Sequence, residues 1–439
     1  MHWTNNEYEQ EIHSDKEALV SAKEPVSTVK AHDPYFALRF RDFRLFLIAS
    51  FVGSLGTQMV YIAIGWELYE RSDSALVLGG VGLAQVLPVI LLSLPAGHIA
   101  DRFHRQTILV LSQALAVLTS LWLAWLSYTH SSIALVYACL ALGGVAMAFN
   151  GPAAESILAH TVPEEAYTNA STWASSSWQL ASVVGPTLGG FAIAVFRSAT
   201  PVYALNTLAG LIITYLLIQL RVRQRPVHQS EPQTTLSSLA EGLRFLSKTQ
   251  VILAAITLDL FAVLFGGATT LLPIYAQDIL HVGPTGLGWL RAAPSIGALV
   301  IAFILTRRPP FKKAGRTLLL AVAGFGAATI IFGISRSFWL SLAMLFVLGG
   351  LDNISVVIRN TLLLVRTPDA MRGRVSAVNA LFVTASNELG GFESGLAAQF
   401  LGPVVTVAGG GVGTILVVIL VALLWPEMRR LGTLIEPKS

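Results

Sequence analysis

The chain has 439 residues, of which 54% are hydrophobic and only 12% are charged, and its formal net charge is +4. Soluble domains usually contain about 25% charged residues, so this composition excludes an ordinary soluble protein and indicates one that crosses a membrane several times. The single cysteine, Cys139, excludes a disulfide within the chain.

Residues 1–40 are polar and contain no apolar segment in MHWTNNEYEQEIHSDKEALV or in the residues that follow. Because a cleavable signal peptide needs an apolar central segment, we expect none here. This stretch is predicted to be a flexible cytoplasmic tail.

Long apolar stretches follow along the rest of the chain. A helix needs about 20 apolar residues to cross a hydrocarbon core about 30 Å thick. Twelve stretches meet this requirement: 44–67, 76–99, 106–127, 132–156, 170–194, 199–220, 251–277, 284–306, 316–334, 337–358, 374–398 and 402–425. The fifth and eleventh are rich in Ser, Thr, Asn and Gly, which is typical of helices that pack against other helices or line a cavity. We therefore expect an all-α membrane protein with twelve transmembrane helices.

Basic residues are distributed unevenly between the two sides that twelve spans define. The loops on one side hold only Arg71, Arg197 and Arg336, whereas the termini and the other loops hold nearly all the remaining lysines and arginines. Because positively charged loops stay in the cytoplasm, we expect both termini to be cytoplasmic. This topology accounts for the net positive charge and requires no nucleic-acid partner.

The longest polar break, at 221–250, separates six spans at 41–220 from six at 251–425, and a short cytoplasmic tail follows at 426–439. Leucines set among polar residues predict an amphipathic helix in this break, lying along the membrane face. A shift of about 206 carries QVLP at 85–88 onto RAAP at 291–294, and one of about 205 carries Gly185 and Gly190 onto Gly390 and Gly395. This agreement predicts two duplicated halves with a binding site between them.

The stretch GHIADRFHRQ at 97–106 lies between the second and third predicted spans. It resembles the loop between helices 2 and 3 of the major facilitator superfamily, whose pattern is Gly, three residues, Asp, Arg, any residue, Gly, Arg, then Arg or Lys. Four residues match this pattern: Gly97, Asp101, Arg102 and Arg105. His104 and Gln106 depart from it. The resemblance implies a fold of two pseudo-symmetric six-helix halves.

The resemblance also implies that this loop, together with Glu155, forms a latch that joins the halves when the protein faces outward. Gly97 would allow close helix contact, and Asp101 would lie near the positive end of the helix that begins near Arg374. Arg102 or Arg105 would pair with Glu155. The alternative is that both arginines only mark the cytoplasmic side. The equivalent loop of the second half has Phe311 in place of the aspartate, so we expect one strong latch.

The stretch GPTLGG at 185–190 resembles the end of the fifth-helix motif of proton-coupled exporters. Pro186 removes a backbone donor and kinks the helix, and we expect Gly185, Gly189 and Gly190 to pack against a helix of the other half. By analogy with the family this contact is a seal against leak, the alternative being ordinary helix packing. Three further stretches resemble the bacterial branch of the superfamily that contains enterobactin exporters and transmembrane secretion effectors: FRLFLIASFVGSLGTQM, GLGWLRAAPSIGALV and TPDAMRGRVSAVN. This resemblance implies that the chain spans a bacterial inner membrane.

Charged residues within spans are costly, and they usually face a cavity or a partner. Five lie in the second half: Asp259, Arg291, Asp352, Glu388 and Glu393. We expect Arg291 to be neutralised by Asp259 or Glu388, and a surplus acid, with Asp259 and Glu388 as the leading candidates, to carry a proton. The alternative is a fixed structural ion pair. Polar and aromatic residues predicted to line a substrate cavity are Gln58, Gln85, Trp173, Gln179 and Asn387.

The sequence contains no GxxxxGK loop for ATP, no cluster of residues that predicts a metal site, and no convincing pair of nucleophile and base. We therefore predict a transporter, not an enzyme, that works as a monomer without a cofactor and exports a small amphipathic compound in exchange for protons. Siderophores, drugs and metabolites all fit this description. The alternatives are a lipid or lysolipid transporter, an importer of the same superfamily, and a membrane scaffold or sensor.

Overall fold

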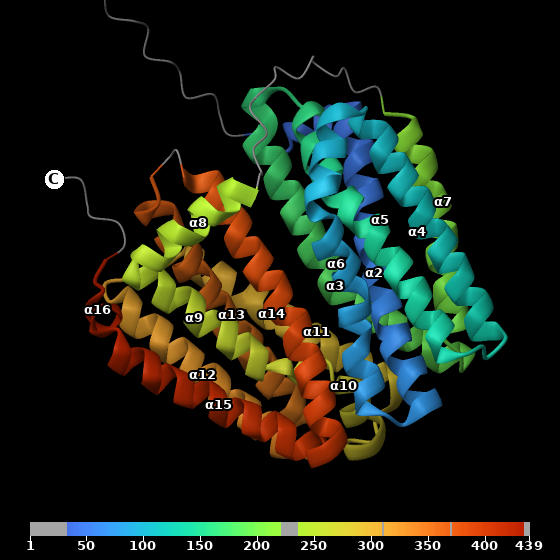
Figure 1. Ribbon diagram of the computed structural model, residues 1–439. Helices are drawn as coiled ribbons and strands as arrows, with labels where there is room; N and C mark the ends of the chain where they lie inside the picture. The colour runs from blue at the N-terminus through green and yellow to red at the C-terminus, as the bar shows by residue number, and fades with distance from the viewer. Residues whose placement is uncertain (1–32, 221–235, 310, 369–370, 434–439) are drawn as a thin grey trace, which may run out of the picture.

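A computed structural model describes residues 33–220, 236–309, 311–368 and 371–433. Figure 1 shows two helical bundles side by side, which we call the N-terminal and the C-terminal half. The helices of the N-terminal half are α2 (Arg41–Ser72), α3 (Ala75–Arg102), α4 (Arg105–Tyr128), α5 (Ile133–His160), α6 (Tyr167–Phe196) and α7 (Thr200–Ile218). Those that follow are α8 (Leu236–Lys248), α9 (Gln250–Phe265), α10 (Leu272–Ile274), α11 (Gly283–Thr306), α12 (Ala314–Ile334), α13 (Phe338–Arg366), α14 (Arg372–Leu401), α15 (Pro403–Leu424) and α16 (Pro426–Arg430).

The expected all-α membrane fold is confirmed, although the count of twelve spans is only partly supported. In the described part of the chain, ten helices are long and apolar enough to cross a membrane. An eleventh span results if α8 and α9, which are bent by 106° relative to each other, are taken together. Helix α14 is 30 residues long but is not among these spans, and it contributes polar residues to the contact between the halves.

The seventh predicted span, at 251–277, is not one continuous helix. Helix α9 ends at Phe265, and a short 3-10 turn, Gly267–Thr269, separates it from α10 and from a π-helical turn at Tyr275–Ile279. Two adjacent glycines, Gly266 and Gly267, and then Pro273 explain the break, because both residue types disfavour a helix interior. The break leaves backbone carbonyl groups that need other hydrogen-bond donors.

Several helices end in a left-handed residue at the end of the molecule opposite the described chain termini. These residues are Asp73, His130, Arg197 and His281, with φ between 47° and 53°. A left-handed residue is a common way to stop a helix, since its backbone turns the chain out of the helical path. Ser74 and Ser132 then begin the next helices by accepting hydrogen bonds from the backbone N–H groups of Val77 and Ala134. We call this end of the molecule the distal end.

The two halves repeat the same pattern of helix contacts. In the N-terminal half α3 packs on α5, α4 on α7 and α2 on α6, and in the C-terminal half α11 packs on α13, α12 on α15 and α9 on α14. The contacts between the halves are paired in the same way, with α3 against α14 and α11 against α6. This correspondence is what two copies of one six-helix plan produce when they are related by a pseudo-twofold axis.

The largest hydrophobic core includes residues from both halves near the distal end. It contains Leu68 and Tyr203 from the N-terminal half and Tyr275, Leu287 and Phe332 from the C-terminal half, all buried. The rings of Tyr275 and Phe332 stack with centroids 4.6 Å apart. Figure 1 shows the two bundles meeting around α3, α10, α11 and α14. The burial of apolar side chains therefore holds the halves together at this end.

Candidate functional site

The stretch GPTLGG places its glycines against two different helices. A Cβ on Gly190 would collide with the carbonyl oxygen of Pro284 and would come within 3.1 Å of Gly288, both on α11 of the other half. Gly189 instead lies against Met59 of α2, in its own half. Gly185 likewise faces α2, where a Cβ would be 2.5 Å from Cβ of Gln58. The expectation that all three glycines pack on the other half is therefore wrong, and only Gly190 does so.

The contact between α3 and α14 is the counterpart of this α6–α11 contact. A Cβ on Gly395 would lie 2.7 Å from Cα of Gly79 and 2.7 Å from the carbonyl oxygen of Ala75. Closer to the distal end, the hydroxyl of Ser74 donates a hydrogen bond to Oε1 of Gln399 at 2.9 Å. Gly190 and Gly395, which the shift of the repeat relates, thus make equivalent contacts across the two halves. We call these two contacts the distal seal.

We expect Gly190→Ala to open the distal seal, because the added methyl group has no room beside Pro284. Overpacking of this kind costs about 1–3 kcal/mol. With Ser74 and Gln399 both replaced by cysteine, the yield of disulfide between them should fall severalfold in the Gly190→Ala protein. Gly409→Ala is the matched control, since a Cβ on Gly409 meets nothing within 4 Å. Equal cross-linking in both variants would show that Gly190 does not set this contact.

A charged cluster lies at the junction of the two halves, close to the break between α9 and α10. Arg291 of α11 donates a hydrogen bond from its guanidinium to the carbonyl oxygen of Thr269 at 3.2 Å, so it satisfies one backbone group that the break leaves exposed. Tyr61 of α2 interacts electrostatically with both Arg291 and Glu388. A Cβ on Gly82 would collide with Oε2 of Glu388, so this carboxyl group lies against the backbone of α3. We call Tyr61, Arg291 and Glu388 the junction cluster.

Asp259 does not belong to this cluster. Its carboxylate forms a buried ion pair with the guanidinium of Arg359 on α13, and the two side chains are only 9% and 5% exposed. The expectation that Asp259 neutralises Arg291 is therefore wrong, and the acid near Arg291 is Glu388. An ion pair this deeply buried is typical of a structural role, because separating its charges leaves an uncompensated charge in a low-dielectric surrounding.

The two remaining acids of the C-terminal half have different surroundings. Asp352 of α13 has no hydrogen bond or ion pair within the described part of the chain. Glu393 of α14 accepts a long hydrogen bond of 3.5 Å from the hydroxyl of Ser394. The expectation of a surplus acid within the membrane therefore applies to Asp352 and Glu393 as well as to Glu388.

A cavity of about 630 Å³ lies inside the N-terminal half, between α2, α4, α5 and α7. Its lining includes Tyr61, so it reaches the junction cluster. The described polar lining residues carry neutral groups: Ser50, Ser54, Thr57, Gln58, Tyr61, Gln85, Ser112, Gln113, Thr119, Ser120, Asn150 and Asn206. The rest of the wall is mainly apolar. Pockets that hold drug-sized ligands are of this size and are lined in this way.

Of the five residues predicted to line a cavity, Gln58 and Gln85 do line this one. Trp173 does not, because its indole N–H donates to the carbonyl oxygen of Pro34 at 3.0 Å and so holds the segment before α2. Gln179 donates to the carbonyl oxygen of Ser295 at 3.3 Å, which adds a bridge between the halves. Asn387 donates to the carbonyl oxygen of Val383 within its own helix at 2.8 Å.

For the predicted latch residues, the structure gives the secondary structure in which they lie. Helix α3 continues to Arg102, so Gly97, Asp101 and Arg102 belong to a helix and not to a loop, and Arg105 begins α4. The side chains of Asp101, Arg102 and Glu155 lie outside the described part of the structure, and so does the burial of Gly97. The latch therefore stays a prediction. Among the described residues, no group of three or more His, Cys, Asp or Glu is placed to hold a metal ion.

Two residues that interact with the charged side chains of the site, Arg359 and Tyr61, are not among the site residues predicted from the sequence. The predicted tenth span ends at 358 and so leaves Arg359 outside the membrane, whereas α13 continues to Arg366. Its distance of seven residues from Asp352, about two helical turns, was a signal that it belongs to the same polar face. Tyr61 carries no such signal, since an aromatic residue in an apolar helix is ordinary.

Comparison with known proteins gives a consistent picture. A family model described as transmembrane secretion effector matches residues 32–431. The multidrug efflux pump Tap of Mycobacterium tuberculosis is 28% identical over 366 residues, covering 79% of this chain and 84% of Tap. The enterobactin exporter EntS of Escherichia coli is 25% identical over 394 residues, covering 88% and 92%. A bacterial homologue of the human lysosomal transporter Spinster, solved in an inward-facing and unoccupied conformation, has a TM-score of 0.67 at 14% identity, covering 89% and 96%.

Proposed function

Because this chain belongs to the transmembrane secretion effector family of the major facilitator superfamily, we propose that it exports a small amphipathic organic compound in exchange for protons. The protein is a multi-span membrane transporter and not an enzyme. We propose further that it lies in the bacterial inner membrane with both termini in the cytoplasm, as its basic loops indicate. The names of the relatives, a multidrug pump and a siderophore exporter, support a small organic cargo.

The observation that carries the proposal is the cavity of the N-terminal half. Among the residues whose side chains the structure describes, none that lines the cavity is Asp, Glu, Lys, Arg or His. Neutral amide and hydroxyl groups lie among apolar side chains in its wall. Such a lining favours a compound that is largely apolar but carries several hydrogen-bonding groups, and it disfavours a small ion. Because Tyr61 belongs both to the cavity and to the junction cluster, a bound compound would contact a side chain that interacts electrostatically with Glu388.

This adjacency supports a mechanism of coupling. When Glu388 is charged, it attracts Arg291, which is fixed to the broken helix through Thr269. Protonation of Glu388 removes that attraction. It therefore changes the energy difference between an arrangement in which α14 packs on α3 and one in which the two helices are separated. With the distal seal closed, the compound enters from the side of the chain termini. Proton binding and compound binding then favour different arrangements of the halves, which is the requirement for exchange.

Inside-out vesicles containing the protein provide the test. We expect one compound from a panel of cationic dyes, siderophores and lysolipids to dissipate an imposed pH gradient in vesicles that contain the wild type and not in vesicles without the protein. Gly143→Phe should abolish this response, because Gly143 lines the cavity and faces open space. Gly409→Phe, at an equally open glycine outside the cavity, should retain it.

Other outcomes contradict specific parts of the proposal. A response limited to lysolipids would favour the lipid transporter, and accumulation in the opposite direction would favour an importer. Transport of a labelled compound without any change of the pH gradient would disprove proton exchange. Unchanged transport in Gly143→Phe would show that the cavity is not the path of the compound.

A further inference from the structure

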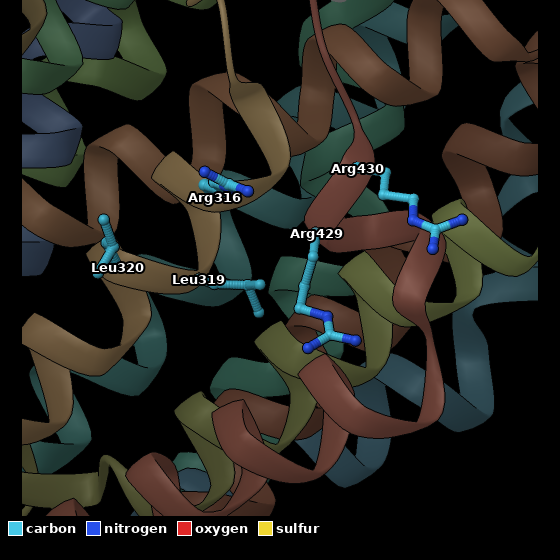
Figure 2. Close-up of a pocket in the computed structure, with 5 residues that line it drawn as sticks. All are labelled: Arg316, Leu319, Leu320, Arg429 and Arg430. Carbon is cyan, nitrogen blue, oxygen red and sulfur yellow. The ribbon is translucent and has the colours of Figure 1, made fainter.

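A second hollow lies outside the transport path, between α12 and α16 at the end of the C-terminal half that is opposite the distal end. It has a volume of about 410 Å³ and is lined by Arg316, Leu319, Leu320, Arg429 and Arg430. Figure 2 shows Leu319 of α12 next to Arg429 of α16, with Arg316 and Leu320 on the same stretch of α12 and Arg430 beside Arg429 on α16. Three arginines and two leucines from two helices therefore share one surface depression.

Packing of the backbone holds the two helices in this position. The backbone N–H groups of Ala314 and Gly315, at the start of α12, donate to the carbonyl oxygens of Gly432 and Leu431 at 3.1 and 3.3 Å. A Cβ on Gly315 would collide with the carbonyl oxygen of Met428, so α16 lies directly on α12. Met428 is fully buried beneath this contact. The arginines of α16 are therefore presented by a fixed element of the fold.

The hollow is strongly basic. The described part of the structure contains no ion pair or hydrogen bond from the side chains of Arg316, Arg429 or Arg430. Lys312 and Lys313 lie exposed just before α12 and add to the positive charge. Glu427 is the one acidic residue of α16, and it does not line the hollow. Among the described residues, no acidic side chain is paired with these three guanidinium groups. A guanidinium group binds phosphate with two parallel hydrogen bonds.

The apolar residues at the hollow indicate whether the anion is a free ion or part of a larger, partly apolar ligand. Leu320 is 72% exposed, and Leu423 and Leu424 at the end of α15 are 64% and 60% exposed. These leucines belong to the surface that faces the hydrocarbon of the bilayer, since α12 and α15 both qualify as membrane spans. A free phosphate ion has no apolar part that could pack against these leucines. An acyl chain beside a phosphate group matches both parts of the hollow.

We propose that the α12–α16 hollow binds the headgroup of an anionic phospholipid, with the phosphate on Arg316, Arg429 and Arg430 and an acyl chain along Leu320. Basic residues at a membrane surface attract anionic lipids, and a hollow formed by two helices adds the geometry for one bound molecule. The site lies on the outer face of the C-terminal half, away from the cavity of the N-terminal half, so lipid binding there does not depend on the transported compound.

Binding of labelled phosphatidylglycerol to the full chain, purified in detergent, tests this proposal against phosphatidylcholine as the neutral lipid. We expect selective binding of phosphatidylglycerol to the wild type and a loss of affinity of at least about tenfold in the triple variant Arg316→Gln, Arg429→Gln, Arg430→Gln. The matched control is Arg244→Gln, Lys248→Gln, Arg308→Gln, which removes the same charge from exposed positions elsewhere and should keep most of the affinity.

Three results would overturn the proposal. Equal loss of affinity in both triple variants would mean that net charge and not this hollow attracts the lipid. Displacement of bound phosphatidylglycerol from the wild type by millimolar inorganic phosphate would identify a site for free anions. If the arginine variant does not fold, the wild type can be labelled with photoactivatable phosphatidylglycerol instead. The proposal is contradicted if neither segment 312–320 nor segment 426–433 is labelled.

Discussion

Replacing Glu388 with glutamine is expected to lower the rate of proton-driven export by about tenfold or more. The free energy that couples two ligands typically changes affinity by roughly 5–150-fold, and the expected loss lies within this range. Glutamine keeps the shape that lies against Gly82 but cannot gain or lose a proton. Exchange of labelled for unlabelled compound needs no net proton movement and should continue. The measurement is therefore the rate of gradient-driven export beside the rate of exchange, in the same vesicles.

Glu393→Gln is the matched control, because Glu393 lies on the same helix five residues further on and is not in the junction cluster. With Glu388 as the proton carrier, Glu393→Gln should retain both rates, whereas loss of gradient-driven export in Glu393→Gln alone would assign the proton to Glu393. If Glu388→Gln keeps gradient-driven export while Asp352→Asn loses it, the proton carrier is Asp352. Loss of both rates in Glu388→Gln would indicate that the carboxyl group binds the compound or supports the fold and does not carry the proton.

Replacing Asp259 with asparagine is expected to lower the free energy of unfolding by about 3–5 kcal/mol, because it leaves the guanidinium of Arg359 buried without its counter-charge. The side chain of Arg359 is only 5% exposed, so water cannot replace the lost carboxylate without a local opening of α9 and α13. Thermal unfolding of the purified protein should show a clear fall in Tm relative to the wild type.

The double variant Asp259→Asn, Arg359→Leu separates the structural role from a role in coupling. Removing both charges should restore much of the lost stability, since the paired charges themselves contribute little net stabilisation. If this double variant is stable and still exports with the pH gradient, Asp259 is a structural partner of Arg359. A stable double variant without gradient-driven export would instead return Asp259 to the coupling pathway.

The sequence alone determined the class of fold and its internal repeat. The length and spacing of apolar stretches indicated the spans, because the thickness of the hydrocarbon core sets how many apolar residues a crossing helix needs. The shift that relates Gly190 to Gly395 predicted two copies of one plan, and the structure places both glycines at equivalent contacts between the halves. The cost of a charge in lipid also indicated that Glu388 and Arg291 belong to a polar site.

Only the tertiary structure decided which groups meet. Successive residues of a helix point about 100° apart, so Gly189 and Gly190 face different helices although they are neighbours in the sequence. A linear pattern gives the depth of a charge in the membrane but not the direction in which it points. For that reason the sequence could not assign Asp259 to Arg359, which a separate helix brings into contact. The partner of a buried charge depends on the rotation and packing of whole helices, which the three-dimensional arrangement alone defines.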